Sequence, residues 1–155
     1  MTHTFVDWRS LDEDDDDGWD QLRCLYAYFS PKEEVLYIGK AWSKTVYARW
    51  RRQAKEGFWD DLEHERRIFN HRVAVGTVAL LAGKRLSHKL LCDIESLLIF
   101  EIGPWGNIQG RDQRIARPGL IVKCRGLSWT HKRRVFRDEN AAPFRDRLEM
   151  GIARQ

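Results

Sequence analysis

Cysteine is scarce in this sequence of 155 residues, which contains only Cys24, Cys92 and Cys124. Their number is odd and they lie far apart, so a framework of disulfides is not expected. No two of them have the spacing of metal ligands, which excludes a zinc ribbon. This cysteine usage is typical of proteins from a reducing compartment.

Long apolar runs and targeting signals are also missing. The longest uncharged apolar stretch, residues 73–83, is too short to cross a bilayer. The N-terminus carries Asp7 and then an acidic run where a secretory signal would have basic and apolar residues. We therefore expect a cytoplasmic protein with no membrane partner. The 43% of hydrophobic residues and the many aromatic side chains predict an ordered core.

Charge is distributed unevenly along the chain. Residues 1–22 contain eight acidic residues and one basic residue, whereas the rest carries a net charge of +11 within a total of +4. Residues 111–137 alone hold nine Arg or Lys and one Asp. A basic body is compatible with a polyanionic partner such as nucleic acid, although basic surfaces also serve solubility alone.

The hydrophobic pattern predicts a short series of helices and strands. Apolar runs at 22–29 and 35–39, joined by a loop that contains Pro31, are typical of an antiparallel hairpin. The clearest helix is expected at 88–102, where Ser87 can cap the N-terminus and Gly103-Pro104 end the pattern. Further helices are expected at 46–56, 58–70 and 140–155, and further strands at 72–82 and 120–123.

This order predicts an α/β (α+β) fold. We expect a small three-stranded, largely antiparallel sheet flanked by helices, followed by a basic C-terminal extension with a further short strand. The corresponding division is an acidic N-terminal segment (1–20), a core (21–110) and the basic extension (111–155), packed on the core. The acidic run itself is expected to be a solvated linker or cap.

Glu95 is unusual within the expected helix 88–102. Its neighbours on the same helical face are Leu91, Leu98 and Ile99. A carboxylate in an apolar stripe costs free energy unless a partner or water compensates it. Glu95 is therefore either an edge residue that reaches water or an inward carboxylate that faces a metal or an arginine. A lone carboxylate would suit Mg²⁺, which keeps most of its waters.

A set of motifs, each weak alone, recurs in a definite order between residues 24 and 107. Cys24-Leu25-Tyr26 is followed after ten residues by Tyr37-Ile38-Gly39 and then by Lys40. Arg49 lies in the next expected helix, and Glu95 is followed by Leu98-Ile99, Pro104 and Asn107. Together these motifs resemble the paired tyrosines, arginine and metal-binding helix of the GIY-YIG nuclease superfamily.

The chain departs from the usual pattern of that superfamily at three places. Cys24 and Leu25 replace Gly and Ile, and about two more residues lie between Tyr37 and Arg49 than in the commonest spacing. Gln53 stands where many members carry a histidine one turn after the arginine, so no histidine at that position can act as a base.

The resemblance implies a metal-dependent endonuclease that hydrolyses DNA phosphodiester bonds with one Mg²⁺ or Mn²⁺. It implies Tyr26, Tyr37, Arg49, Glu95 and Asn107 as the catalytic set, with Gly39 and Lys40 as auxiliary residues and Glu95 as the metal ligand. Tyr37 is our choice of general base and Tyr26 positions water or phosphate, although the two roles could be exchanged. Arg49 suits the phosphoryl oxygens because guanidinium binds them bidentately.

The substrate class is left open as single-stranded, branched or site-specific duplex DNA, with a homodimer if both strands are cut. The main alternative is a catalytically inactive nucleic-acid-binding regulatory module of the same fold. Basic residues could bind phosphates and tryptophans could stack on bases. The candidates for nucleic-acid binding are Arg51, Arg52, Trp105, Arg114, Arg117, Lys123, Arg125, Lys132, Arg133 and Arg134, with Trp129 as a further stacking residue.

Overall fold

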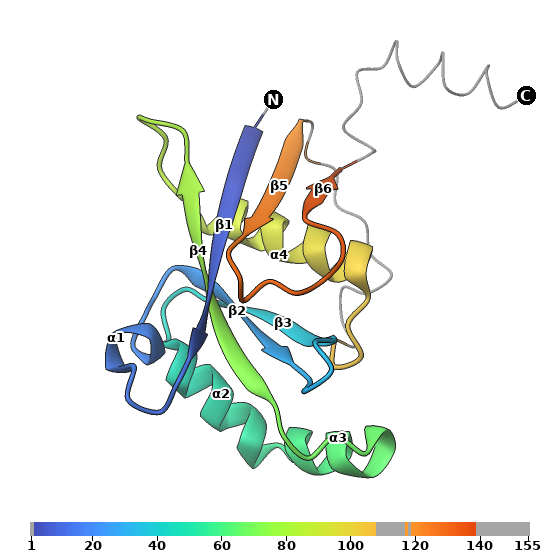
Figure 1. The fold of residues 1–155 in the computed structure, drawn as a ribbon. Helices are drawn as coiled ribbons and strands as arrows, with labels where there is room; N and C mark the ends of the chain where they lie inside the picture. The colour runs from blue at the N-terminus through green and yellow to red at the C-terminus, as the bar shows by residue number, and fades with distance from the viewer. Residues whose placement is uncertain (1, 108–116, 118, 139–155) are drawn as a thin grey trace, which may run out of the picture.

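The computed structural model describes residues 2–107, 117 and 119–138 (Figure 1). Six strands form a single sheet in the order β3-β2-β4-β1-β5-β6. The strands are β1 (Thr2–Leu11), β2 (Cys24–Phe29), β3 (Val35–Ala41), β4 (Arg72–Leu80), β5 (Leu120–Arg125) and β6 (Val135–Arg137). The helices are α1 (Asp16–Trp19), α2 (Val46–Lys55), α3 (Phe58–Arg66) and α4 (His88–Ile102).

The sheet is mixed. β1 pairs in parallel with β5, where Thr2 lies opposite Leu120, and antiparallel with β4, where Trp8 lies opposite Gly76. All other neighbours are antiparallel. The sheet is curled, and α4 crosses its inner face behind β1 and β5 in Figure 1, in contact with β2, β3 and β6.

The predicted three-stranded, largely antiparallel sheet is therefore wrong. Strands β2, β3 and β4 form as expected, but β1 joins β4 to β5, so the N-terminal segment, the core and the C-terminal extension all contribute to one sheet. The reason is an alternation that the acidic composition of residues 1–20 concealed. Thr4, Val6 and Trp8 are buried on one face of β1, while Asp7 and Arg9 are exposed on the other.

Helix α4 confirms the helix predicted at 88–102. The Ser87 hydroxyl accepts a hydrogen bond from the backbone N–H of Leu90, and Gly103 ends the helix in the left-handed conformation with φ 63°. The apolar stripe is buried against the inner face of the sheet, and each such side chain contributes about 1.5–3 kcal/mol of burial free energy. Its members are Leu90, Leu91, Ile94, Leu97, Leu98 and Ile99.

A second core fills the opposite face, between β2, β3 and β4 on one side and α2 and α3 on the other. Tyr28 and Leu62 are its largest fully buried members from β2 and α3. Helix α2 begins after Thr45, whose hydroxyl accepts from Ala48 N at 3.1 Å. Helix α3 is shorter than the predicted 58–70, because Arg67 adopts a left-handed conformation (φ 57°) and ends it.

One of the predictions lies outside this picture. The final helix expected at 140–155 lies outside the described residues. Among the residues that the structure describes, no helix has the length and apolar character needed to cross a membrane.

Candidate active site

Tyr26, Tyr37, Arg49, Glu95 and Asn107 line a single cavity of about 480 Å³. They come from β2, β3, α2, α4 and the loop after α4, respectively. Lys40 lines the same cavity, and Gly39 lies beside it. The cavity is also lined by Ile38 and Ile99, which belong to the motifs, and by Gly106, which the sequence had not singled out.

The position of β3 at the edge of the sheet lets the cavity collect groups from both faces. The register of β2 and β3 shifts between Tyr28 and Phe29, since Tyr28 lies opposite Tyr37 and Phe29 opposite Val35. Successive residues of β3 point to opposite faces of the sheet, so Tyr37 packs against the second core, whereas Ile38 belongs to the core under α4. Lys40, three residues after Tyr37 and thus on the opposite face, reaches Glu95 of α4.

Gly39 is required by the path of the Tyr26 side chain. The two residues lie opposite each other in the β2–β3 ladder, and a Cβ at position 39 would lie 2.4 Å from Tyr26 Cζ and 2.5 Å from its hydroxyl oxygen. The phenol of Tyr26 therefore crosses the β3 backbone where a side chain is missing. A glycine inside a strand often marks such a close approach.

The tyrosines form a connected group. Tyr26 is buried with 3% of its surface exposed, Tyr37 is half-buried, and their ring centroids are 5.9 Å apart. The interaction between the two hydroxyls acts to raise the pKa of Tyr26 and opposes the increase at Tyr37. Burial raises the pKa of both tyrosines, and Arg49 acts to lower both. Lys40 also acts to lower the pKa of Tyr37, whereas Glu95 acts to raise it, and on balance the pKa of Tyr37 lies above its usual value.

Tyr28 supports this group from behind, and sequence reasoning had missed it. Its ring stacks on Tyr37 with centroids 5.3 Å apart and an interplanar angle of 21°. Its hydroxyl donates to the side-chain oxygen of Gln53 on α2. Gln53, the residue in place of the expected histidine, is thus a hydrogen-bond acceptor for a buried tyrosine and does not line the cavity.

Glu95 is directed inward, which is one of the two alternatives that its place in an apolar stripe left open. Its side chain is 15% exposed, and Lys40 Nζ donates to its Oε1 at 3.2 Å. Burial raises the pKa of Glu95, while Lys40, Arg49 and His88 act in the opposite direction. Glu95 is the one carboxylate among the described residues that line the cavity.

Arg49 brings a positive charge to the cavity without a counterion from the described part of the chain. None of the ion pairs found there involves Arg49, and its Nε atom is buried without a hydrogen-bond partner. A buried donor of this kind costs free energy until an acceptor binds. With Lys40 and Arg49 against Glu95, the lining has one excess positive charge and suits an anion.

Asn107 organises the loop that covers the β3 edge. Its Oδ1 accepts from Ile38 N at 2.9 Å, and its Nδ2 donates to Ile38 O at 2.8 Å. One residue earlier, Gly106 N donates to Leu36 O at 2.7 Å. Asn107 is only 5% exposed, so its observed role is to hold the loop against β3. A Cβ on Gly106 would lie 2.8 Å from the carbonyl oxygen of Leu36.

The donor set of the cavity bears on which metal ion it could hold. It offers one carboxylate, and no group of three or more His, Cys, Asp or Glu side chains suited to a metal occurs in the described residues. Such a set does not fit zinc, which prefers three or four protein ligands. It fits Mg²⁺ or Mn²⁺, because such a hard cation keeps several waters and binds one or two carboxylates together with substrate phosphates.

Most of the predicted nucleic-acid-binding arginines already have partners within the protein. Arg125 binds Asp7 through two nitrogens at 2.6 and 2.9 Å. Arg117 pairs with Asp93, Arg133 with Glu101 and Arg52 with Glu56. Arg134 donates to three backbone carbonyls, of which that of Trp129 is nearest at 2.9 Å.

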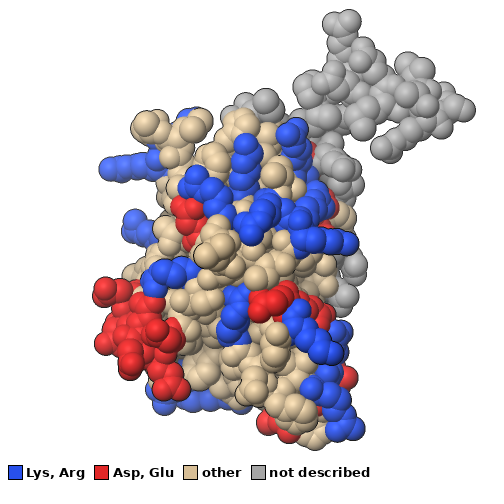
Figure 2. All heavy atoms as spheres, in the orientation of Figure 1, with Lys and Arg blue, Asp and Glu red and all other residues tan. Residues whose placement is uncertain are grey.

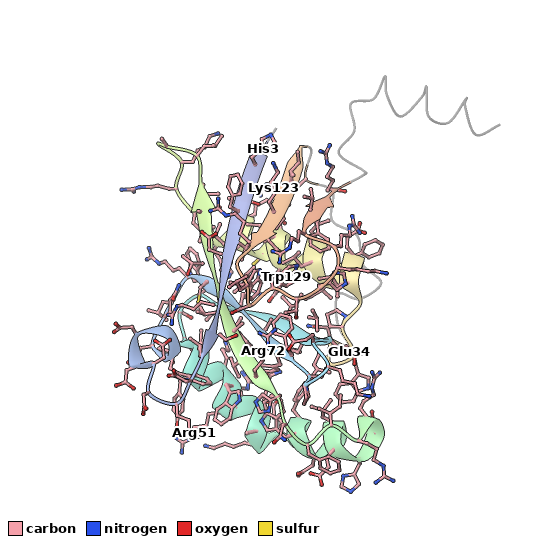
Figure 3. The ribbon with its side chains drawn as sticks, in the orientation of Figure 1. His3, Glu34, Arg51, Arg72, Lys123 and Trp129 are labelled. Carbon is pink, nitrogen blue, oxygen red and sulfur yellow. The ribbon has the colours of Figure 1, made fainter. Side chains whose placement is uncertain are left out.

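Arg51, Lys123 and Lys132 have no ion pair in the described part of the chain. Lys123 projects from β5 near the end of β1 that carries His3 (Figure 3). Lysine and arginine side chains gather over this part of the sheet, whereas the acidic side chains gather over α1 (Figure 2). Arg114 lies outside the described residues.

The two tryptophans proposed to stack on bases differ. Trp105 is half-buried against Phe58, next to the cavity-lining Gly106. Trp129 is fully buried, stacks on Trp8 with centroids 5.2 Å apart and donates its indole N–H to Arg133 O (Figure 3). Trp129 is therefore a core residue and cannot stack on a base.

Comparison with models of protein families, with curated proteins and with solved structures finds no match to this chain.

Proposed function

We propose that this chain is an endonuclease of the GIY-YIG type that hydrolyses DNA phosphodiester bonds with one divalent cation. The observation that carries the proposal is that the predicted site residues meet in space. Five residues selected by sequence motifs between positions 26 and 107 line one cavity, although five different segments supply them. The excess positive charge of that cavity suits a phosphate.

In this proposal the scissile phosphate binds at Arg49, whose guanidinium lacks a counterion among the described residues and cannot lose its proton. Tyr37 would accept the proton of the attacking water as its anion, with Arg49 and Lys40 offsetting part of the increase in its pKa that burial and Glu95 cause. Tyr26 holds Tyr37 in place by the contact between their rings. Asn107 positions the β3 edge, and so the backbone beside Tyr37, without touching the reacting atoms.

Glu95 would hold Mg²⁺ or Mn²⁺, and the cation when bound would neutralise charge on the phosphate and on the leaving oxygen. Lys40 Nζ, 3.2 Å from Glu95 Oε1, keeps the carboxylate directed into the cavity. We assign the protein to a reducing compartment such as the cytoplasm, since Cys24, Cys92 and Cys124 are all free thiols.

A second candidate is a catalytically inactive module that binds nucleic acid with the same cavity. The ion pair between Lys40 and Glu95 favours it, because Lys40 occupies one oxygen of the proposed metal ligand. In such a module Lys40 and Arg49 would bind a phosphate, and Glu95 would serve only to orient Lys40.

Cleavage assays with Mg²⁺ on duplex, single-stranded and branched DNA, and on RNA, would test the proposal. All arms must use one salt concentration, because non-specific binding changes steeply with salt. We expect the wild type to cut at least one DNA substrate and Glu95→Gln to lose cleavage by at least about 100-fold while it still binds.

Glu101→Gln is a matched control, because Glu101 lies on the same helix with the same 15% exposure but pairs with Arg133 outside the cavity. It should retain cleavage. A wild type that binds DNA yet cuts none of the substrates, with unchanged binding in Glu95→Gln, would favour the inactive module. Full cleavage by Glu95→Gln would refute both the metal site and the mechanism.

A further inference from the structure

The acidic N-terminal segment forms one wall of a second cavity, of about 440 Å³, against the N-terminal half of α2. Its lining consists of three aromatic side chains, Trp19, Tyr47 and Trp50, and three carboxylates, Glu13, Asp16 and Asp20. None of these six residues lines the cavity that contains Glu95. The segment is therefore a structured part of the protein surface and not only a solvated linker.

The three rings that line the cavity contact one another. Trp19 lies edge-on to Tyr47, with centroids 6.2 Å apart and an interplanar angle of 87°. It is also edge-on to Trp50, at 5.6 Å and 65°. Tyr47 and Trp50 are one helical turn apart on α2 and stack at 6.2 Å and 30°. All three rings therefore contribute aromatic surface to one cavity.

Hydrogen bonds fix both tryptophans, and the ring of Trp50 also stacks on His71 with centroids 6.4 Å apart and an interplanar angle of 29°. The indole N–H of Trp19 donates to Asp12 O at 2.7 Å, and that of Trp50 donates to His71 Nε2 at 3.2 Å. His71 in turn stacks on Trp59 with centroids 3.8 Å apart. The segment is tied to the body as well, because Gln21 O accepts from Val46 N at 3.3 Å and Gln21 Nε2 donates to Thr77 Oγ1 at 2.8 Å.

We propose that this cavity, which we call the aromatic cage, binds a quaternary or methylated ammonium group. Aromatic faces attract cations through their quadrupole, and three carboxylates add a negative potential. Further acidic residues surround α1, which forms the strongly acidic region of the surface in Figure 2. The cavity therefore selects cations, in contrast to the cavity that contains Glu95.

Methylation is favoured over a bare ammonium because of hydration. A primary ammonium is compact and strongly hydrated, so transfer to an aromatic surface costs it more than it costs a weakly hydrated cation. Among the described residues, no lysine or arginine fills this role, since their cation–π contacts involve the rings of Trp42, Phe29, Phe5 and Phe136.

Two sources carry this chemistry: a free quaternary amine such as choline, and a trimethyllysine side chain in a peptide. Both can be titrated against the full-length protein, with the indole N–H signals of Trp19 and Trp50 as the NMR readout. An unmethylated peptide and 3,3-dimethylbutan-1-ol, the uncharged isostere of choline, are the matched ligands. We expect saturable shifts with a methylated cation, and at least about tenfold weaker binding of each matched ligand.

Variants of the protein locate the site. Tyr47→Ala and the pair Asp16→Asn/Asp20→Asn should each weaken binding about tenfold, whereas Tyr47→Phe should retain it because it keeps the ring. Asp14→Asn is the control for charge, because Asp14 is exposed in the same acidic run but does not line the cavity. Tyr47 is 45% exposed, so its truncation should not unfold the protein.

Tighter binding of the methylated peptide would assign the cage to a modified lysine, and tighter binding of choline would assign it to a free amine. The proposal is overturned if neither saturates the Trp19 and Trp50 signals at about 10 mM. Equal binding of choline and its uncharged isostere would overturn it as well, as would unchanged affinity in Tyr47→Ala. None of these outcomes bears on DNA cleavage, because the aromatic cage and the Glu95 cavity share no residue.

Discussion

Gly39→Ala is the most direct perturbation of the proposed active site, because the expected cost comes from one steric contact. The new Cβ would lie 2.4 Å from Tyr26 Cζ, 2.5 Å from its hydroxyl oxygen and 2.8 Å from Cε1. The backbone of Gly39 is not in the left-handed region, so alanine brings no strain of its own there. Any loss of stability must therefore come from the displacement of Tyr26.

Tyr26 has little room to move. It is 97% buried and its ring contacts Tyr28 and Tyr37 at centroid distances of 5.7 and 5.9 Å. Overpacking of such a site costs about 1–3 kcal/mol. A shift of Tyr26 by about 1 Å would also misplace Tyr37, whose ring it contacts, and should reduce cleavage about 100-fold.

The assay is urea denaturation of Gly39→Ala alone and in a Tyr26→Leu background. We expect the free energy of unfolding to fall by about 1–3 kcal/mol in the wild-type background. In the Tyr26→Leu background, Gly39→Ala should be neutral or stabilising, because alanine is more favourable than glycine within a strand. Equal effects in both backgrounds would refute the steric account of Gly39.

The remaining predictions concern the loop that contains Asn107 and the buried cysteine thiols. Asn107→Ala should lower the free energy of unfolding by about 1–3 kcal/mol and speed amide exchange at Ile38, because two buried backbone groups lose their partners; unchanged exchange at Ile38 would contradict this. Burial raises the pKa of Cys24 and of Cys124 to about 12. The unfolded chain therefore loses these protons at lower pH than the native protein, so stability should decrease as pH rises above about 9 in urea titrations. Mass spectrometry after alkylation at pH 8 should find Cys92 modified first. Alkylation of Cys24 before Cys92 would argue against the burial of the Cys24 thiol.

The sequence was most informative where the signals are local. The Ser87 cap, the apolar stripe of α4 and the stop at Gly103 all lie within one segment, so the helix at 88–102 could be predicted with its bounds. Strand β1 could not, because its partners are residues 73–80 and 120–125, and its own pattern was hidden by the neighbouring acidic run. The alternation of Thr4, Val6 and Trp8 was the signal that could have revealed it.

Members of the candidate site were predictable as a set but not in their roles. Gly39 alone was consistent with an ordinary turn or bulge, and only the structure places it under the ring of Tyr26. The arginines of the basic stretch looked free in the sequence, yet Arg117, Arg125 and Arg133 pair with acidic residues distant in the chain. Such pairing depends on tertiary contacts that charge counts cannot reveal.

The edge position of β3 connects these findings. In an interior strand of a sheet, residues 37 and 40 would face separate cores, and no single cavity could include both. At an edge, a ligand can contact Tyr37 from one face and Lys40 with Glu95 from the other. An open edge would also invite pairing with another chain, and the loop at Gly106 and Asn107 prevents this by occupying the backbone groups of Leu36 and Ile38. The same loop therefore closes the sheet edge and forms one wall of the cavity.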